Sequence, residues 1–453
     1  MQPTTCSGGL FGMKLPDHIL IVGLGMTGVA TALFLAKMGK KITIVDEKPE
    51  KDLSVPLKAL EGIQFAGRFG PHRKEDFLAH SLIVLSPGVD SEHPFLREAK
   101  EKGIKVIGEM ELACAFIDEP IIAVTGTNGK TTVTTLMGEI FKKAYGDVFV
   151  GGNIGDPLIN YVLKGIKTRF VIIEVSSFQL ETIEAFRPKT AILLNVTEDH
   201  LDRYRSFAEY RDAKYRIFEN QQEDDYAILN TNLPSIEGIR AQKRFFSTEK
   251  DVEEGSFFKD GVMTVRLKGE EYCYERAISP LVGIHNTENL LVAILVAHIH
   301  GLEEDLIREA VRDFKGLPHR VEAIRQIDNI LFYNDSKATN VDSTKRALES
   351  VDGRVVLIAG GKDKGGSYKV IADQMKKVRA LILIGEAKER INAELGVYTE
   401  TYMESNLSGA VKRAFKVAKD GDVVLFSPMC SSFDMFRDYK DRGNQFKTMV
   451  ESL

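Results

Sequence analysis

A glycine-rich stretch early in the second hundred residues has the residue types of a phosphate-binding loop. In "IIAVTGTNGKTTVTT" an apolar run ends at Gly126, and Lys130 opens a helical pattern. Backbone N–H groups around the glycines can bind phosphate, the Lys130 ammonium can lie near β- and γ-phosphates, and the Thr131 hydroxyl is a candidate magnesium ligand. Val124 stands where a strict Walker A motif has its first glycine. The predicted loop comprises Gly126, Thr127, Asn128, Gly129, Lys130, Thr131 and Thr132.

An earlier stretch, "HILIVGLGMTGVATALFLAKMGKKITIVD", carries a second nucleotide signature. Gly23, Gly25 and Gly28 fit G-x-G-x-x-G between an apolar run and a helical pattern, and Asp46 ends the next apolar run. Such glycines allow a tight turn beside a diphosphate at a helix N-terminus, and the acidic residue can accept a hydrogen bond from a ribose hydroxyl. NAD fits this pattern. Since no evident hydride-transfer residues follow, another diphosphate such as a nucleotide sugar fits it as well.

Acidic and imidazole side chains occur in and after two later apolar runs. Glu174 lies inside the apolar "FVIIEVSS", where a carboxylate is costly unless it is paired or bound to a cation. His200 lies in the polar cluster of "NVTEDHLDRY". Magnesium takes few protein ligands and keeps waters and phosphate oxygens, so Thr131, Glu174 and His200 would suffice for one or two ions. A salt bridge in the core is the alternative interpretation of Glu174.

The segments that must position these residues alternate between short β-branched runs and helical patterns. Nine runs are typical of buried parallel strands: "HILIVG", "KITIVD", "SLIVLSPG", "IIAVTG", "RFVIIEVSS", "TAILLNV", "RVVLIAGG", "ALILIG" and "DVVLFSP". They end in residues such as Gly, Ser, Asp and Asn, where an α/β sheet presents its ligand-binding loops. We therefore predict an α/β fold with mostly parallel, doubly wound sheets. "GSFFKDGVMTVRLKGEEYCYE" is expected to form an antiparallel insertion.

Length and composition set limits on the class of protein. The chain of 453 residues suggests about two to four domains, and we place three, at residues 1–108, 109–316 and 317–453. A net charge of −5 from 60 basic and 65 acidic residues gives no electrostatic footprint for nucleic acid. The four dispersed cysteines form no CxxC pair, which argues against zinc and disulfide frameworks.

The sequence also predicts a location. No apolar run approaches the ~18 residues that a spanning helix requires, so we expect no membrane insertion. Residues 1–16 contain no apolar signal-peptide core and are interpreted as a loose lead-in. The cytoplasm is therefore the expected compartment.

Nine motifs in order resemble the Mur ligases of bacterial peptidoglycan synthesis: "GTNGKTT", "GGNIG", "EVSSFQLE", "NVTEDHLDRY", "YRDAKYRIF", "GIHNTEN", "GLPHRVE", "NDSKATN" and "SPMCSSFDMF". The resemblance implies Rossmann-like N- and C-terminal domains that flank a central P-loop-type ATPase domain. It also implies the reaction: ATP phosphorylates the carboxyl of UDP-N-acetylmuramoyl-L-alanine, and the amine of D-glutamate attacks the acyl phosphate to form an amide. Two phosphate-binding turns then serve two substrates, UDP in the first and ATP in the second.

The resemblance further assigns roles by position. UDP-substrate contacts are expected at Gly23, Gly25, Thr27, Gly28, Asp46, Ser86, Pro87, Gly88, Asn153 and Ser176. Besides the loop residues, ATP contacts are expected at Asn286, Arg320, Asp335 and Lys337, and D-glutamate contacts at Thr339, Lys364, Ser432, Phe433 and Tyr439. The implied catalytic residues are Lys130, His200, Lys214 and Arg320. The implied metal ligands, for two magnesium ions, are Thr131, Glu174, His200 and Lys214, the last as a carbamate.

Several alternatives remain open from the sequence. Glu47 and Lys48 replace the Thr-Arg type pair expected beside uracil, and "GGKDKGG" leaves Lys362 as a rival to Lys364. A sister ligase that adds another amino acid is the nearest rival function, although no "DNPR"-like motif is present. Folylpolyglutamate synthase, an NAD-dependent oxidoreductase and a non-catalytic nucleotide switch are further alternatives. We expect a monomer.

Overall fold

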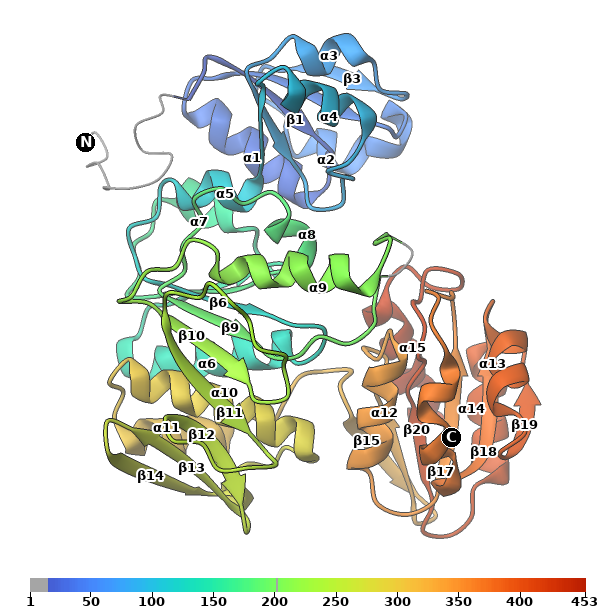
Figure 1. Cartoon of the computed structure of the whole chain (residues 1–453). Coiled ribbons are helices and arrows are strands. Elements are labelled where there is room, and N and C mark those ends of the chain that lie inside the picture. Colours follow the sequence, from blue (N-terminus) through green and yellow to red (C-terminus); the bar gives the residue numbers. More distant parts are fainter. Residues whose placement is uncertain (1–14, 201–202) are drawn as a thin grey trace.

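The computed structural model describes residues 15–200 and 203–453, and it arranges them around three separate sheets (Figure 1). Residues 1–14, which include most of the predicted lead-in and Cys6, lie outside the described residues, as do Leu201 and Asp202. The three sheets comprise residues within 18–108, 121–275 and 322–426, so each falls inside one of the predicted domain ranges. We retain those ranges as our proposed domain boundaries.

The first sheet has five parallel strands in the order β3-β2-β1-β4-β5. Its strands are β1 (His18–Val22), β2 (Lys41–Asp46), β3 (Ala66–Phe69), β4 (Leu82–Leu85) and β5 (Lys105–Gly108). The helices beside it are α1 (Met26–Lys37), α2 (Ser54–Lys58), α3 (Lys74–Leu78) and α4 (Pro94–Glu101), with the 3-10 turn η2 (Glu50–Leu53). Strand β1 is fully sandwiched, because Ile19, Leu20, Ile21 and Val22 are all at most 1% exposed.

The central sheet has nine strands in the order β14-β13-β12-β11-β10-β9-β6-β8-β7. The parallel part contains β6 (Ile121–Thr125), β7 (Phe149–Gly152), β8 (Val171–Glu174), β9 (Thr190–Leu193), β10 (Tyr226–Asn230) and β11 (Gln242–Ser247). Strand β12 (Gly255–Lys259) pairs parallel with β11 and antiparallel with β13 (Val262–Leu267), which pairs antiparallel with β14 (Glu270–Glu275). The predicted antiparallel insertion is therefore confirmed.

Helices cover both faces of the central sheet. They are α5 (Glu109–Cys114), α6 (Lys130–Tyr145), α7 (Leu158–Lys164), α8 (Ser177–Leu180), α9 (Phe207–Tyr215), η3 (Arg216–Phe218), η4 (Arg276–Ile278), α10 (Ile284–Ile299) and α11 (Glu304–Asp313). Helix α1 of the first sheet packs against α7, and apolar side chains of both domains form one continuous cluster there. Burial of this shared apolar surface fixes the first domain on the central one.

The third sheet has six strands in the order β15-β16-β20-β17-β18-β19, all parallel except the β15–β16 pair. Its strands are β15 (Glu322–Ile327), β16 (Ile330–Asn334), β17 (Val355–Gly360), β18 (Val378–Ile384), β19 (Glu400–Met403) and β20 (Val423–Phe426). The helices are α12 (Val341–Ser350), η5 (Tyr368–Lys377), α13 (Lys388–Leu395), α14 (Leu407–Val417) and α15 (Tyr439–Glu451).

The predicted α/β class is confirmed, and all nine predicted strands are present as parallel strands. Among the helices of residues 15–200 and 203–453, none is both long and apolar enough to cross a bilayer. The three cysteines in the described ranges, Cys114, Cys273 and Cys430, are free thiols.

Candidate active site

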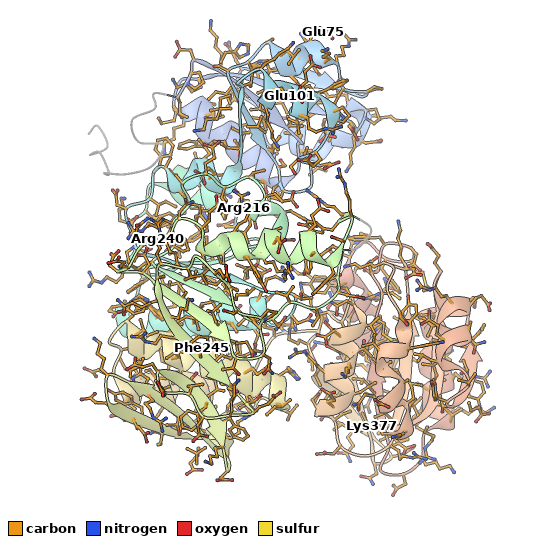
Figure 2. All side chains as sticks on the ribbon, viewed as in Figure 1. Glu75, Glu101, Arg216, Arg240, Phe245 and Lys377 are labelled. Carbon is orange, nitrogen blue, oxygen red and sulfur yellow. The ribbon has the colours of Figure 1, made fainter. Side chains whose placement is uncertain are left out.

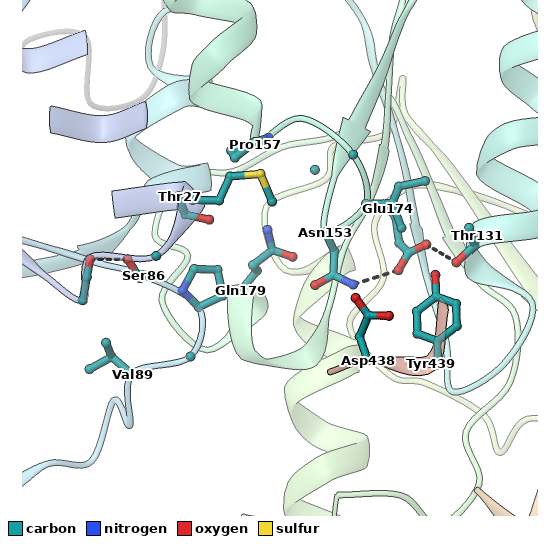
Figure 3. A pocket seen from close by; sticks show the side chains of 18 of the residues that line it. Thr27, Ser86, Val89, Thr131, Asn153, Pro157, Glu174, Gln179, Asp438 and Tyr439 are labelled. Atoms are coloured by element: carbon teal, nitrogen blue, oxygen red, sulfur yellow. Dashed lines mark hydrogen bonds between the residues drawn. The ribbon is translucent and has the colours of Figure 1, made fainter. Parts of the chain in front are cut away.

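One cavity of about 1290 Å³ is lined by residues from all three domains (Figure 3). The first domain contributes the Gly23 turn and the turn after β4. The central domain contributes Thr131 and Glu174, and the third domain contributes Arg320 and Tyr439. Both glycine-rich turns follow the carboxyl end of a parallel strand, so their helix N-termini can face a common space.

The first glycine-rich turn is held by hydrogen bonds on both sides. Gly23 adopts φ 90° and donates to the Val45 carbonyl at 2.8 Å, while its own carbonyl accepts from Ser86 Oγ at 2.8 Å. The Asp46 carboxylate accepts from the N–H groups of Leu24 at 2.7 Å and Lys48 at 2.9 Å. Asp46 therefore fixes the backbone of the turn in addition to lining the cavity.

Most of the predicted UDP-substrate residues line this cavity. They are Gly23, Gly25, Thr27, Asp46, Ser86, Pro87, Gly88 and Asn153. Gly28 and Ser176 are not among the lining residues. A Cβ at Gly28 would lie 2.0 Å from the Gly23 carbonyl oxygen, so this glycine allows helix α1 to approach the turn. The Ser176 hydroxyl caps helix α8 by accepting from the Gln179 N–H at 3.2 Å.

The second glycine-rich turn joins β6 to the 16-residue helix α6. Gly129 has φ 88°, and the Lys130 ammonium folds back to donate to the carbonyl oxygens of Gly126 at 2.8 Å and Thr127 at 3.0 Å. Burial lowers the pKa of Lys130, while the carboxylates of Glu174 and Asp199 act in the opposite direction. The turn therefore combines a helix N-terminus with a cation, which suits the phosphates of a nucleotide.

Glu174, at the end of β8, is hydrogen-bonded to the helix that follows this turn. Its carboxylate is buried and accepts from Thr131 Oγ at 2.8 Å and from Asn153 Nδ2 at 2.8 Å (Figure 3). Both donors are neutral, so the buried negative charge is not neutralised by its hydrogen bonds. A carboxylate, a hydroxyl and an amide together suit magnesium, which prefers oxygen ligands and takes few of them from the protein. Within the described part of the chain, no three His, Cys, Asp or Glu side chains form a metal-ligand cluster.

His200 and Lys214 do not line the large cavity. His200 adopts φ 56° and packs its ring edge against Phe178, with 5.0 Å between ring centroids. Lys214 in α9 is 2% exposed and donates to the Gly126 carbonyl at 3.0 Å. Burial first, and then the charge of Lys130, lower the pKa of Lys214 well below its usual value. A neutral amine at this position is therefore favoured.

A second, smaller cavity adjoins the phosphate turn at Asn128 and Gly129. It is lined by Asn128, Gly129, Asn195, His285, Glu288, Asn289, Arg320, Val321, Asp335, Ala338, Ser343, Arg346 and Ala347. Arg320 also lines the large cavity, so its side chain connects the two spaces. Burial raises the pKa of Asp335 to about 7, and Ser427 Oγ donates to it at 2.7 Å. Asn286 is buried beside this cavity and donates to the Val282 carbonyl at 2.7 Å.

Comparisons with known proteins identify the family of this chain. Three family models match the chain: "Mur ligase MurD-like, N-terminal domain" at residues 17–108, "Mur ligase middle domain" at 124–297 and "Mur ligase, glutamate ligase domain" at 319–430. A curated UDP-N-acetylmuramoylalanine–D-glutamate ligase from Geotalea daltonii is 50% identical over 440 residues, covering 96% of this chain and 97% of its own. The chain belongs to the Mur ligase family. The ligase of the same name from Geobacter metallireducens is 48% identical over 441 residues, 96% of this chain and 97% of its own.

Solved structures share the fold of this Mur ligase at low sequence identity. MurF ligase from Thermotoga maritima in complex with ADP has a TM-score of 0.62 at 16% identity, covering 91% of this chain and 95% of that one. A pseudomurein peptide ligase type C from Methanothermus fervidus has a TM-score of 0.61 at 18% identity, covering 96% of this chain and 100% of that one. The arrangement of three α/β domains is therefore found in solved structures.

The predicted D-glutamate residues of this Mur ligase come from three loops of the third domain. Tyr439, at the start of α15, lines the large cavity, and Lys337 Nζ lies over its ring at 4.0 Å. Lys364 Nζ lies 3.4 Å from Asp199 Oδ1 of the central domain. Lys362, the rival lysine, pairs its backbone with Ser431 instead. The choice of Lys364 over Lys362 remains a prediction.

The remaining members of this set are placed differently. Ser432 is 2% exposed, whereas Phe433 is 70% exposed. The N–H of Thr339 donates to the Lys337 carbonyl at 2.9 Å, which places it in the turn before α12. No role in amino-acid binding follows from these positions alone, so the assignment of these three residues remains a prediction.

Some residues around the site of this Mur ligase were not predicted from its sequence. Asn195 after β9 accepts from the Asn128 N–H at 2.9 Å and holds the phosphate turn. Gln179 and His72 line the large cavity. Asn195 could have been found, because it ends a predicted strand beside the phosphate turn. Gln179 lies within the short helix α8, just after strand β8. His72 follows strand β3, which the sequence did not predict.

Proposed function

We propose that this Mur ligase joins D-glutamate to UDP-N-acetylmuramoyl-L-alanine at the expense of ATP, in the synthesis of peptidoglycan precursors. The observation that carries the proposal is the cavity of about 1290 Å³ in which a diphosphate-type turn, a phosphate-turn threonine and cations of the third domain meet. The named relatives support the same substrates. A ligase of this kind contributes to the cell wall, and through it to cell shape and division.

The first domain would bind the UDP part of the substrate. The backbone N–H groups at the start of α1 and the N–H of Gly88 would donate to the diphosphate. Gly25 leaves open space at this point, because a Cβ there would have no atom within 4 Å. The bound nucleotide would extend the muramoyl-alanine portion along the cavity toward Asn153 and Glu174.

The second turn would bind ATP, with its adenosine directed toward the smaller cavity. Thr131 and Glu174 are the residues that would hold magnesium, and Lys214 as a carbamate with His200 would complete a second site. Bound magnesium supplies positive charge that stabilises the transferring phosphoryl group. Carbamate formation requires a neutral amine, and the lowered pKa of Lys214 favours that form.

The chain's own cations would then serve the phosphoryl transfer. Lys130, Arg320 and Lys337 are close enough to influence one another's pKa, and burial first, then Arg320, lower the pKa of Lys337 to about 8. Such a cationic set reduces the repulsion when a substrate carboxylate oxygen attacks the γ-phosphorus and ADP leaves. The D-glutamate amine, after losing a proton, attacks the acyl carbon of the acyl phosphate. Collapse of the tetrahedral intermediate then releases phosphate and leaves the amide.

The third domain would supply the amino acid. Lys364 and Tyr439 would bind its carboxylates, and the ion pair of Lys364 with Asp199 supports this by bringing the lysine to the central domain. Because one chain provides all three domains around the cavity, we propose a monomer as the active form. The cytoplasm, where ATP and UDP-linked sugars are available, is the proposed location.

Phosphate release from ATP tests this function. The purified chain is assayed with UDP-N-acetylmuramoyl-L-alanine and, separately, D-glutamate, L-glutamate, L-lysine, meso-diaminopimelate and L-alanine. We expect release only with D-glutamate. Release with another amino acid alone would make the chain a sister ligase, and no amino-acid-dependent release would refute ligase function.

A further inference from the structure

A network of side chains joins the substrate turn of the first domain to the loop that carries His200. Glu181, at the end of α8, is its centre. Its Oε2 accepts from Ser91 Oγ at 2.8 Å and from Arg203 Nη2 at 3.2 Å, and its Oε1 accepts from Tyr204 OH at 2.5 Å. Ser91 belongs to the first domain and the other residues to the central one. The side chains of Glu181 and Arg203 are only 17% and 21% exposed, so solvent weakens this ion pair less than an open surface pair.

Arg203 also contacts the backbone of the turn 86–89, whose four residues all line the large cavity. Its guanidinium donates through Nη2 to the Val89 carbonyl at 3.1 Å and through Nη1 to the Pro87 carbonyl at 3.4 Å. The turn is closed by the Val89 N–H, which donates to the Ser86 carbonyl at 3.0 Å. The guanidinium lies over the Phe178 ring at 3.9 Å, which fixes the plane of the fork.

The direction of these carbonyl groups matters for an anionic ligand. In a trans peptide the C=O and N–H groups point in opposite directions, and no described peptide bond is cis. When Arg203 holds the Pro87 carbonyl, the N–H of Gly88 is turned away from the guanidinium. A carbonyl oxygen facing a diphosphate would repel it, whereas an N–H group attracts it.

The same network is tied to the chemistry of the central domain. The N–H groups of Arg203 and Tyr204 both donate to the His200 carbonyl at 3.0 Å. Arg216, labelled in Figure 2, donates to the carbonyl oxygens of Leu180 at 2.8 Å and Glu181 at 2.7 Å, so the end of α8 is itself held in place. Glu181 and Arg203 therefore connect the substrate turn to the part of the central domain that carries the predicted metal and phosphate residues. This connection should resist displacement of the turn.

We propose that Glu181 and Arg203 are positioning residues for the UDP-linked substrate, and that they hold the turn 86–89 with the Gly88 N–H toward the diphosphate. This inference rests on the proposed function, because it requires a diphosphate in the first domain. It assigns the pair no contact with ATP or the amino acid. Its effect is confined to the affinity for the UDP-linked substrate and to the alignment of that substrate with the phosphoryl group.

Steady-state kinetics of Arg203→Met, Arg203→Lys and Glu181→Gln test the proposal, with Arg205→Ala as the matched control. Arg205 is an exposed arginine two residues farther along the same loop. For Arg203→Met we expect KM for UDP-N-acetylmuramoyl-L-alanine to rise about tenfold, because charged hydrogen bonds to the turn are lost. KM for ATP and for D-glutamate should stay within about twofold of wild type, and Arg205→Ala should match wild type in all three. The KM of Arg203→Lys for the UDP-linked substrate should lie between those of wild type and Arg203→Met, since lysine keeps the positive charge but lacks the two-pronged guanidinium.

A double variant separates coupling from general destabilisation. If the two residues act as one unit, Arg203→Met combined with Glu181→Gln should raise this KM little more than either change alone. Thermal melting identifies a variant that fails to fold, in which case Arg203→Lys provides the measurement. An unchanged KM for the UDP-linked substrate, or an equal rise in KM for ATP, would overturn the positioning role. Failure of the wild-type chain to turn over these substrates would refute the proposed function instead.

Discussion

A substitution at Gly25, in the first glycine-rich turn, should affect ligand binding without affecting folding. It is the N-cap residue of α1 with φ −81°, a conformation that any L-residue adopts. A Cβ at this position would meet no atom within 4 Å, and Gly25 lines the large cavity. The side chain of Gly25→Val should therefore enter the space that we assign to the diphosphate without disturbing the fold.

The magnitude follows from the contacts that the valine would displace. Two hydrogen bonds from backbone N–H groups to a charged diphosphate are together worth about 3–6 kcal/mol, which corresponds to an affinity loss of at least about 100-fold. The free energy of unfolding should fall by only about 1 kcal/mol, the cost of a poorer N-cap residue. Gly25→Ala should give a smaller loss of affinity.

Gly28 in the same turn provides the contrast. A Cβ there would lie 2.0 Å from the Gly23 carbonyl oxygen, which is backbone and cannot rotate away. Gly28→Ala should therefore lower the free energy of unfolding by about 3 kcal/mol, the upper end of the usual cost of overpacking, because the helix is forced against the turn.

Thermal melting and separate titrations with UDP-N-acetylmuramoyl-L-alanine and ATP measure these effects. We expect Gly25→Val to bind ATP normally, to bind the UDP-linked substrate weakly and to melt near the wild-type temperature. Normal binding of that substrate by a folded Gly25→Val would refute the assignment of the turn. Tight NAD binding by the wild type without binding of the UDP-linked substrate would favour an oxidoreductase.

Three further predictions concern the ATP side. Lys130→Ala should fold normally but lose most ligase activity, since the phosphate turn loses its cation; near-normal phosphate release would contradict the assignment of this turn to ATP. Lys214→Ala and Lys214→Arg should both be nearly inactive in the same assay, with short-chain carboxylates partly restoring only the alanine variant; a fully active arginine variant would exclude a carbamate. Because burial raises the pKa of Asp335 to about 7, the native state keeps a proton that the unfolded chain loses near pH 4. Stability is therefore lost as pH rises from about 4 to about 7, by at most about 4 kcal/mol, and urea unfolding of Asp335→Asn should show a smaller loss.

The strands that the sequence predicted share one property, which is burial on both faces. Strand β17, for example, has Val355, Val356, Leu357, Ile358 and Ala359 all fully buried. A continuous apolar run is the signature of such strands in parallel sheets. Edge and near-edge strands such as β3, with "AGRF", and β19, with "ETYM", are short and half exposed. These strands form by pairing with a neighbouring strand of the folded sheet, so no local sequence pattern identifies them.

The site was predictable where backbone conformation requires a particular residue. Gly23 and Gly129 adopt positive φ values, and Gly28 must lack a Cβ, so glycine spacing located both turns. Contacts between domains were not predictable from the same evidence. Asn128 of the phosphate turn accepts from Ser343 Oγ and donates to Asp342 Oδ2, both at 2.7 Å, across more than 200 residues of sequence. Such pairs depend on the relative placement of two folded units.

Both glycine-rich turns join a parallel strand to a helix, but their backbone geometry differs: the N-cap residue Gly25 is extended, with φ −81°, whereas Gly129 is left-handed, with φ 88°. Their charged surroundings differ as well, and this second difference matches their proposed roles. In the first turn, the Asp46 carboxylate binds the N–H groups of Leu24 and Lys48, and it adds negative charge near the ligand. In the second, Lys130 and Lys214 both donate to the Gly126 carbonyl, and Glu174 lies beside Thr131. The UDP diphosphate does not react, so orientation by N–H groups is sufficient. The transferring phosphoryl group changes its charge distribution during the reaction, and Lys130, together with Arg320 and Lys337 of the third domain, provides preorganised positive charge that stabilises such a change.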